Sequence, residues 1–134
     1  MKLSRKCEYA SLILIQLSTV YGDDNPLPSS VLSEDNLIPR KFLDQIMNLL
    51  KKNGYVESIR GVSGGYRLSK PPSDISLAEI IRLIDGPIAP IASVSTHFYK
   101  HTPSAQNDKL LRCFKDIRDY AAEKLEALTF DQLV

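Results

Sequence analysis

Apolar residues recur every three or four positions in several stretches of this 134-residue chain. This spacing predicts helices that each bury one face. The stretches cover residues 3–21, 39–53, 77–85 and 108–127, and residues 29–35 allow one further helix of at most two turns. In the second of them the expected core positions are Phe42, Leu43, Ile46, Met47, Leu49 and Leu50.

Capping residues support the helix boundaries. Pro39 is suited to the first position of its helix, because its fixed φ matches helical backbone and its missing N–H is not needed there. Ser76 and Glu79 form a predicted capping box, in which each side chain accepts from the other's backbone N–H. Thr129 with Gln132 resembles a second capping box that opens a terminal turn.

The pattern changes from helical to alternating after Gly54. Residues 55–59 and 66–68 read as two short strands, joined by a hairpin tip in which three of the six residues are glycines. A short helix, a longer helix and then a hairpin is the order of a winged helix-turn-helix. The sequence therefore predicts a mainly α protein with one small β-hairpin.

Residues 87–107 lack periodicity and hold three of the eight prolines, so we expect a long connecting loop. We divide the chain into a winged helix-turn-helix DNA-binding domain (1–86), a sensor or connecting loop (87–107) and a dimerisation helix with a terminal turn (108–134). The last helix needs a partner for its apolar face, which predicts a homodimer. The face comprises Leu110, Leu111, Phe114, Ile117, Ala121 and Leu125.

Polar residues on the second helix of the motif are candidates for contact with double-stranded DNA, and the dimer would bind a palindromic operator. The candidates are Arg40, Lys41, Asp44, Gln45 and Asn48 on that helix, Arg60, Gly61, Gly64 and Gly65 at the hairpin tip, and Lys2, Arg5 and Lys6 at the N-terminus. Gln45 could pair with adenine and Asp44 with cytosine, or both could be solvated polar positions. Arg60 could approach phosphates or the minor groove, or the glycines could only satisfy turn geometry.

Composition changes this picture little. The formal net charge is +1, with residues 1–70 holding ten Lys/Arg against seven Asp/Glu, which permits a DNA-binding end. No apolar run approaches the ~20 residues of a membrane span, and two cysteines far apart fit a reducing cytoplasm. The sequence offers no P-loop, nucleophile elbow, dinucleotide fingerprint or paired-histidine motif, so we expect no enzyme.

Several motifs together resemble the Rrf2 family of bacterial transcription regulators. They are Ile38-Pro39-Arg40-Lys41-Phe42-Leu43-Asp44-Gln45-Ile46, Gly54-Tyr55-Val56, Arg60-Gly61, Gly64-Gly65-Tyr66-Arg67-Leu68, Pro71-Pro72, and residues 1–4, 8–10 and 128–130. The resemblance implies a homodimeric winged-helix transcription factor, usually a repressor, with the C-terminal helix as the dimer interface.

The sequence departs from the family in two places. Leu37 stands where the family often has glycine at the turn of the motif. Residues 87–112 contain none of the three cysteines that hold an iron–sulfur cluster in the metal-binding members, so the standard site is absent.

Other residues near the loop could still sense a signal. Glu8, His97, His101 and Cys113, with Cys7, are candidate ligands for an iron–sulfur cluster or zinc, because the family brings the first helix of one subunit near the loop of the other. The alternative is that both cysteines are buried apolar residues and the other groups are solvated. A second functional hypothesis is a winged-helix module that senses through a partner protein without binding an operator.

Overall fold

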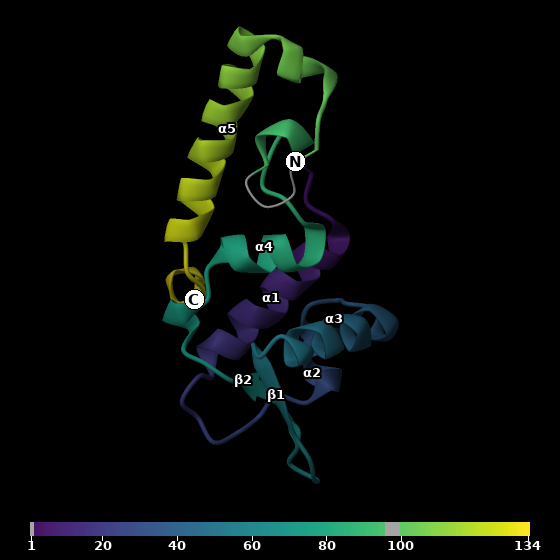
Figure 1. The fold of residues 1–134 in the computed structure, drawn as a ribbon. Coiled ribbons are helices and arrows are strands. Elements are labelled where there is room, and N and C mark those ends of the chain that lie inside the picture. The colour runs from purple at the N-terminus through teal and green to yellow at the C-terminus, as the bar shows by residue number, and fades with distance from the viewer. Residues whose placement is uncertain (1, 96–99) are drawn as a thin grey trace.

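The computed structural model describes residues 2–95 and 100–134. It is mainly helical with one small hairpin, as the sequence predicts (Figure 1). The principal elements are α1 (Arg5–Thr19), α2 (Ser29–Asp35), α3 (Arg40–Lys52), β1 (Val56–Ile59), β2 (Gly65–Leu68), α4 (Leu77–Asp85) and α5 (Asp108–Ala127). Short 3-10 turns lie at Pro72–Asp74, Ala92–Val94, Pro103–Gln106 and Phe130–Leu133.

The central element of the core is α1. Its N-cap is Ser4, whose hydroxyl oxygen accepts from the backbone N–H of Cys7 at 3.1 Å. The buried side chains of α1 follow helical spacing, so a single face meets α3, α4 and the hairpin. These side chains join the buried residues of α2 and α3 in one hydrophobic cluster.

The C-terminal end of the chain completes that cluster. Phe130 is fully buried in it, and its N–H donates to the carbonyl of Ile75 at 3.1 Å. The N–H of Leu77 donates in turn to the carbonyl of Leu128 at 2.8 Å. The last turn therefore packs against α1 and the segment before α4, although more than 50 residues separate them along the chain.

The predicted capping box at the start of α4 is confirmed. The Ser76 hydroxyl oxygen accepts from the N–H of Glu79 at 3.2 Å, and a Glu79 carboxylate oxygen accepts from the N–H of Ser76 at 2.8 Å. Gly86 ends α4 with a φ of +87°. These contacts fix both ends of a helix that packs on α1 and α5.

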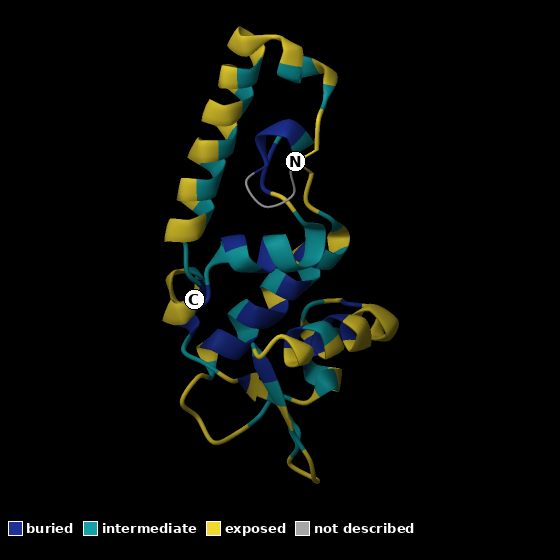
Figure 2. Ribbon diagram, viewed as in Figure 1, coloured by how far each residue is buried: buried dark blue, intermediate teal, exposed yellow. Residues whose placement is uncertain are grey.

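Helix α5 stands beside the connecting segment and extends away from the hairpin (Figure 1). None of its twenty residues is buried, and Figure 2 shows an exposed outer edge and a half-buried inner one. Its C-terminal part packs on α4 through Ala121, Ala122 and Leu125. An Arg118 Nη1–H donates to the carbonyl of Val94 at 2.7 Å, which ties the connecting segment to the helix.

Four local predictions are wrong. Pro39 is the N-cap residue, so α3 begins one position later, at Arg40. Thr129 forms no capping box, because its hydroxyl donates to Asp131 and the turn that follows is 3-10. Phe42 is 43% exposed because it lies at the edge of the apolar face, where its ring packs against Tyr9 with centroids 6.1 Å apart. Cys113 is exposed on α5.

None of the described helices combines the length and hydropathy that a membrane span requires.

Candidate nucleic-acid interface

Helix α3 presents one polar face to solvent. Leu43, Ile46, Met47 and Leu50 are buried, so the helix is anchored by the opposite side. All five polar residues that the sequence singles out on this helix are exposed: Arg40, Lys41, Asp44, Gln45 and Asn48. They occupy the positions between the buried ones, which places their side chains outside the core.

The Arg40 side chain is engaged at the beginning of that face. Its Nη2–H donates to the hydroxyl oxygen of Ser29 at 2.6 Å, and its Nε lies 3.5 Å from an Asp44 carboxylate oxygen. The guanidinium therefore bridges the first residue of α2 and the second turn of α3. Sequence reasoning placed Arg40 on the correct face and missed this contact, because nothing local signals Ser29 as a partner.

The hairpin carries an exposed tip. Strands β1 and β2 pair antiparallel, with Val56 opposite Leu68 and Ile59 opposite Gly65. Arg60 follows β1 directly and is exposed, as are Gly61 and the residue after it. Gly61 has a φ of +120°, which only glycine adopts readily, so this tip requires glycine at that position.

Strand β2 is fixed, close to the hairpin tip, against the segment that leads into α2. Leu27 and Tyr66 exchange two backbone hydrogen bonds, of 2.9 and 2.8 Å, in an isolated antiparallel bridge. A Cβ on Gly65 would lie 2.3 Å from the carbonyl oxygen of Leu27, so glycine is needed for this close approach. The sequence predicted Gly65 as a DNA-contact residue, and the structure places it opposite Ile59, in the strand pair next to the tip, where it packs on Leu27.

The turn between α2 and α3 contains a non-glycine residue in left-handed conformation. Leu37 has a φ of +53°. Its N–H donates to the carbonyl of Glu34 at 3.3 Å, and the N–H of Ile38 donates to the carbonyl of Ser33 at 2.9 Å. This is the Schellman arrangement that usually has glycine at the left-handed position. The Leu37 side chain is 86% exposed, whereas Ile38 is buried.

Comparison with known proteins decides the family. The model of the Rrf2 family, described as iron-dependent transcriptional regulators, matches residues 3–134. The chain belongs to the Rrf2 family. Its fold is accordingly a winged helix-turn-helix with a C-terminal helix, in a family of DNA-binding transcription regulators.

Individual relatives within the Rrf2 family cover almost the whole chain. The transcriptional regulator CymR of Bacillus subtilis is 32% identical over 133 residues, which is 99% of this chain and 89% of that protein. The solved structure of CymR, titled the global cysteine regulator of B. subtilis, aligns with a TM-score of 0.80 and 30% identity over 99% of this chain and 95% of that chain. The structure of T. potens IscR aligns with a TM-score of 0.70 and 27% identity over 99% and 86% of the two chains.

The candidate metal ligands that the structure describes, Glu8, His101 and Cys113, form no metal-binding group within one chain. Glu8 is paired with Arg5 at 2.9 Å, His101 and Cys113 are exposed, and His97 lies outside the described residues. Among the residues that the structure does describe, no group of three or more His, Cys, Asp or Glu side chains could hold a metal ion. A site shared by two chains stays a prediction, which iron, zinc and sulfide analysis of anaerobically purified protein would test.

Cys7 is a buried thiol near the N-terminal end of α1. Burial, followed by the charge of Asp85, raises its pKa to about 11, so the thiol keeps its proton at neutral pH. Asp85 also binds the N-cap residue of α1, because its carboxylate accepts from the N–H of Ser4 at 2.8 Å. The prediction that Cys7 is buried is confirmed, and a thiolate role at this position is unfavourable.

The N-terminal cations are separate from the hairpin tip. Lys2 and Arg5 are exposed, and Figure 1 shows the beginning of α1 at the end of the winged domain away from the hairpin tip. Any phosphate contact that Lys2 or Arg5 makes would therefore be distinct from that of Arg60.

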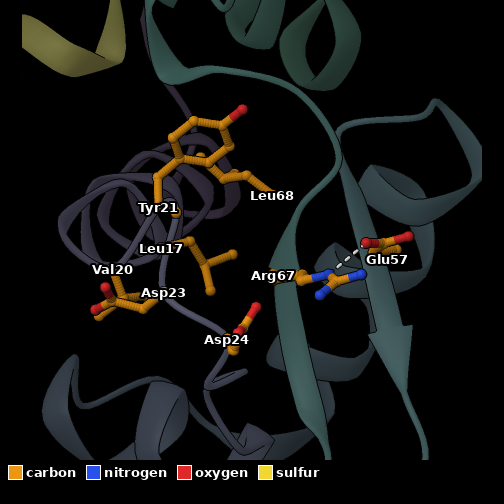
Figure 3. Close-up of a pocket in the computed structure, with 9 residues that line it drawn as sticks. Leu17, Val20, Tyr21, Asp23, Asp24, Glu57, Arg67 and Leu68 are labelled. Carbon is orange, nitrogen blue, oxygen red and sulfur yellow. Dashed lines mark hydrogen bonds and ion pairs between the residues drawn. The ribbon is translucent and has the colours of Figure 1, made fainter.

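A hollow of about 250 Å³ lies between the end of α1 and the hairpin (Figure 3). Asp23, Asp24 and Glu57 contribute carboxylates to it, and Arg67 is its one lining cation, paired with Glu57. We call this the acidic hollow. Its net charge of −2 from these four residues repels a nucleic-acid backbone, so DNA would approach the hairpin from elsewhere.

Proposed function

We propose that the protein is a homodimeric repressor that binds a palindromic operator through α3 and the hairpin tip. The observation that supports this most is that the polar face of α3 and the hairpin tip are connected through packed elements: the Leu27–Tyr66 bridge joins β2 to the segment before α2, and both α2 and β1 pack on α3. In a winged helix-turn-helix these two features enter the major groove and contact the flanking backbone or minor groove. Its place of action would be the cytoplasm.

Base contacts would come from the middle of α3. Lys41, Gln45 and Asn48 are exposed, and the charge of Lys41 is not paired with any described carboxylate, so their polar groups face solvent, where base edges or phosphates could reach them. Gln45 suits adenine, because its amide oxygen can accept from the N6 amino group while its amide N–H donates to N7. Asp44 suits the N4 amino group of cytosine, if Arg40 releases it.

The dimer would form through α5. Leu110, Ile117 and Tyr120 are 43%, 48% and 74% exposed in the single chain, which is a large apolar surface for one helix. Replacing both Phe114 and Ile117 by Asp should give monomers in sedimentation, with circular dichroism unchanged because neither residue is part of the main core. A dimeric, folded double variant would contradict the α5 interface.

The test of DNA binding starts from sequences selected by the purified protein from a random duplex library. We expect an imperfect palindrome, since a two-fold protein reads two related half-sites. Arg60→Ala should weaken operator binding by about 1–3 kcal/mol and lower the salt slope by about 1 if the contact is a phosphate. Loss of preference for A·T-rich flanks would instead indicate the minor groove.

The matched control is Lys109→Ala, which removes one positive charge at the start of α5, far from the hairpin (Figure 1). Its affinity should stay close to that of the wild type. Failure to select any DNA sequence, together with retention of a partner protein, would favour the interaction-module hypothesis over the operator.

A further inference from the structure

A second hollow, of about 350 Å³, separates the start of α2 from the tip of the hairpin. Its walls include Pro28 and Ser29 on one side and Ser58, Arg60, Gly64 and Tyr66 on the other. We call it the wing notch. Unlike the acidic hollow, it has no carboxylate in its lining, and Arg60 is its one charged lining residue.

A second cation reaches the opposite wall. Ser29 lines the notch, and its hydroxyl oxygen already accepts from the Arg40 guanidinium at 2.6 Å. Arg60 of the hairpin tip therefore lines one wall of the notch, and Arg40 of α3 contacts the other wall through Ser29. Arginine presents several N–H donors in a planar fork, so each can bind an anionic oxygen without losing its other contacts.

The walls are held in place before any ligand binds. The Leu27–Tyr66 bridge joins the segment before Ser29 to β2 through two backbone hydrogen bonds. Glycine allows this spacing, since a Cβ on Gly65 would lie 2.3 Å from the carbonyl oxygen of Leu27. A site of fixed width selects an anion of matching size at little cost in conformational entropy.

We propose that the wing notch holds one backbone phosphate of the operator in each half-site, bound between Arg60 and the Arg40–Ser29 pair. This inference rests on the proposed function and adds a specific contact to it. Arg40 then serves as a phosphate ligand, and base selection falls to the residues that follow it on α3. The two arginines contact the same phosphate, so the hairpin and α3 are fixed relative to a single point of the DNA.

The experiment pairs protein variants with operators in which one phosphate at a time is replaced by an uncharged methylphosphonate. At one linkage per half-site the replacement should weaken wild-type binding by about tenfold, as expected for loss of a charge-assisted hydrogen bond. At that same linkage the methylphosphonate should lower the operator affinity of the Arg40→Ala and Arg60→Ala variants by less than about twofold. Each variant has already lost part of the contact with that phosphate. Lys41→Ala is the matched control, and it should retain the full tenfold loss there.

A second variant tests the notch without removing a charge. Ser58 is exposed and lies opposite Tyr66 in the hairpin, so Ser58→Phe fills the notch while both arginines remain. We expect weaker operator binding, no sensitivity to the critical methylphosphonate, and an unchanged circular dichroism spectrum. Inorganic phosphate at millimolar concentration should not restore or compete with binding, because the occupant is part of the duplex.

The outcomes separate the two proposals. If the wild type binds no selected duplex, the proposed function and this inference both fail. If the wild type binds but Arg40 and Arg60 are coupled to different linkages or to none, or Ser58→Phe binds normally, the operator function stands and the wing notch is not a phosphate site.

Discussion

The first and last helices, α1 and α5, are both amphipathic, but α1 packs into the core and α5 is partly or fully exposed along its length. Helix α1 buries six residues, whereas α5 buries none of its twenty. The main hydrophobic cluster is complete without α5, because the terminal turn around Phe130 closes it. An amphipathic pattern therefore specifies that a face must be covered, and it leaves open whether the same chain or another molecule covers it.

This difference predicts unequal costs for equal substitutions. Leu14 in α1 is fully buried, so Leu14→Ala should lower the free energy of unfolding by about 2.5–5 kcal/mol. Leu110→Ala in α5 removes the same atoms from a residue that is 43% exposed, and should cost under about 1 kcal/mol in the monomer. Urea denaturation at low protein concentration measures both.

At higher concentration the Leu110→Ala cost should increase if α5 is a dimer interface, because dimerisation stabilises the folded chain by mass action. Equal costs for the two variants at every concentration would remove the contrast between the helices.

The second prediction concerns pH and the buried thiol of α1. The pKa of Cys7 is about 11 in the folded chain and 9.0 in an exposed cysteine. Below pH 9 both states keep the proton, and between pH 9 and 11 only the unfolded chain loses it. The free energy of unfolding should therefore fall with rising pH across that window, by about 2–3 kcal/mol.

The measurement is the difference between wild type and Cys7→Ala in denaturation series at pH 8 and pH 11. The subtraction removes contributions from other groups, such as Tyr55, whose pKa burial also raises. Parallel pH profiles for the two proteins would show that Cys7 keeps its ordinary pKa.

The third prediction uses the turn before α3. A leucine in left-handed conformation is strained by about 1–2 kcal/mol, and glycine adopts it without strain but loses about 0.5–1 kcal/mol through a more flexible unfolded chain. Because the Leu37 side chain buries almost nothing, Leu37→Gly should raise stability by up to about 1 kcal/mol. Leu37→Ala keeps the strain and should show no gain in thermal unfolding.

The smallest expected effect is on chemical reactivity. Cys113 is exposed and Cys7 is buried, so a thiol reagent should modify one cysteine per folded chain and two per unfolded chain. Mass spectrometry of digested protein identifies the site. Fast modification of Cys7 under native conditions would mean that the N-terminal part of α1 opens readily.

Local signals in the sequence were sufficient for much of the fold. Helical spacing located α1, α3, α4 and α5, and the pair Ser76 and Glu79 defined a capping box that the structure contains. The change to alternation and the concentration of glycines located the hairpin. Each of these features depends on residues within a few positions of one another.

The contacts that build the candidate site were not predictable in this way. The bridge from Leu27 to Tyr66 and the hydrogen bond from Arg40 to Ser29 join residues that are distant in sequence. Neither hydrophobic periodicity nor a local motif predicts such contacts. Leu37 shows the same limit. Its left-handed backbone is retained by the two hydrogen bonds of the turn and the burial of Ile38, against its own local preference.

The buried position of Phe130 has a consequence for synthesis on the ribosome. The core around α1 lacks one of its largest side chains until residue 130 has emerged from the exit tunnel. Helix α3 and the hairpin leave the tunnel first, as part of a domain whose apolar centre is still open, and we expect them to become stable only after α5 has also been made. A nascent chain arrested before that residue should thus remain a target for chaperones and proteases, and operator binding should begin only with chains that have passed it.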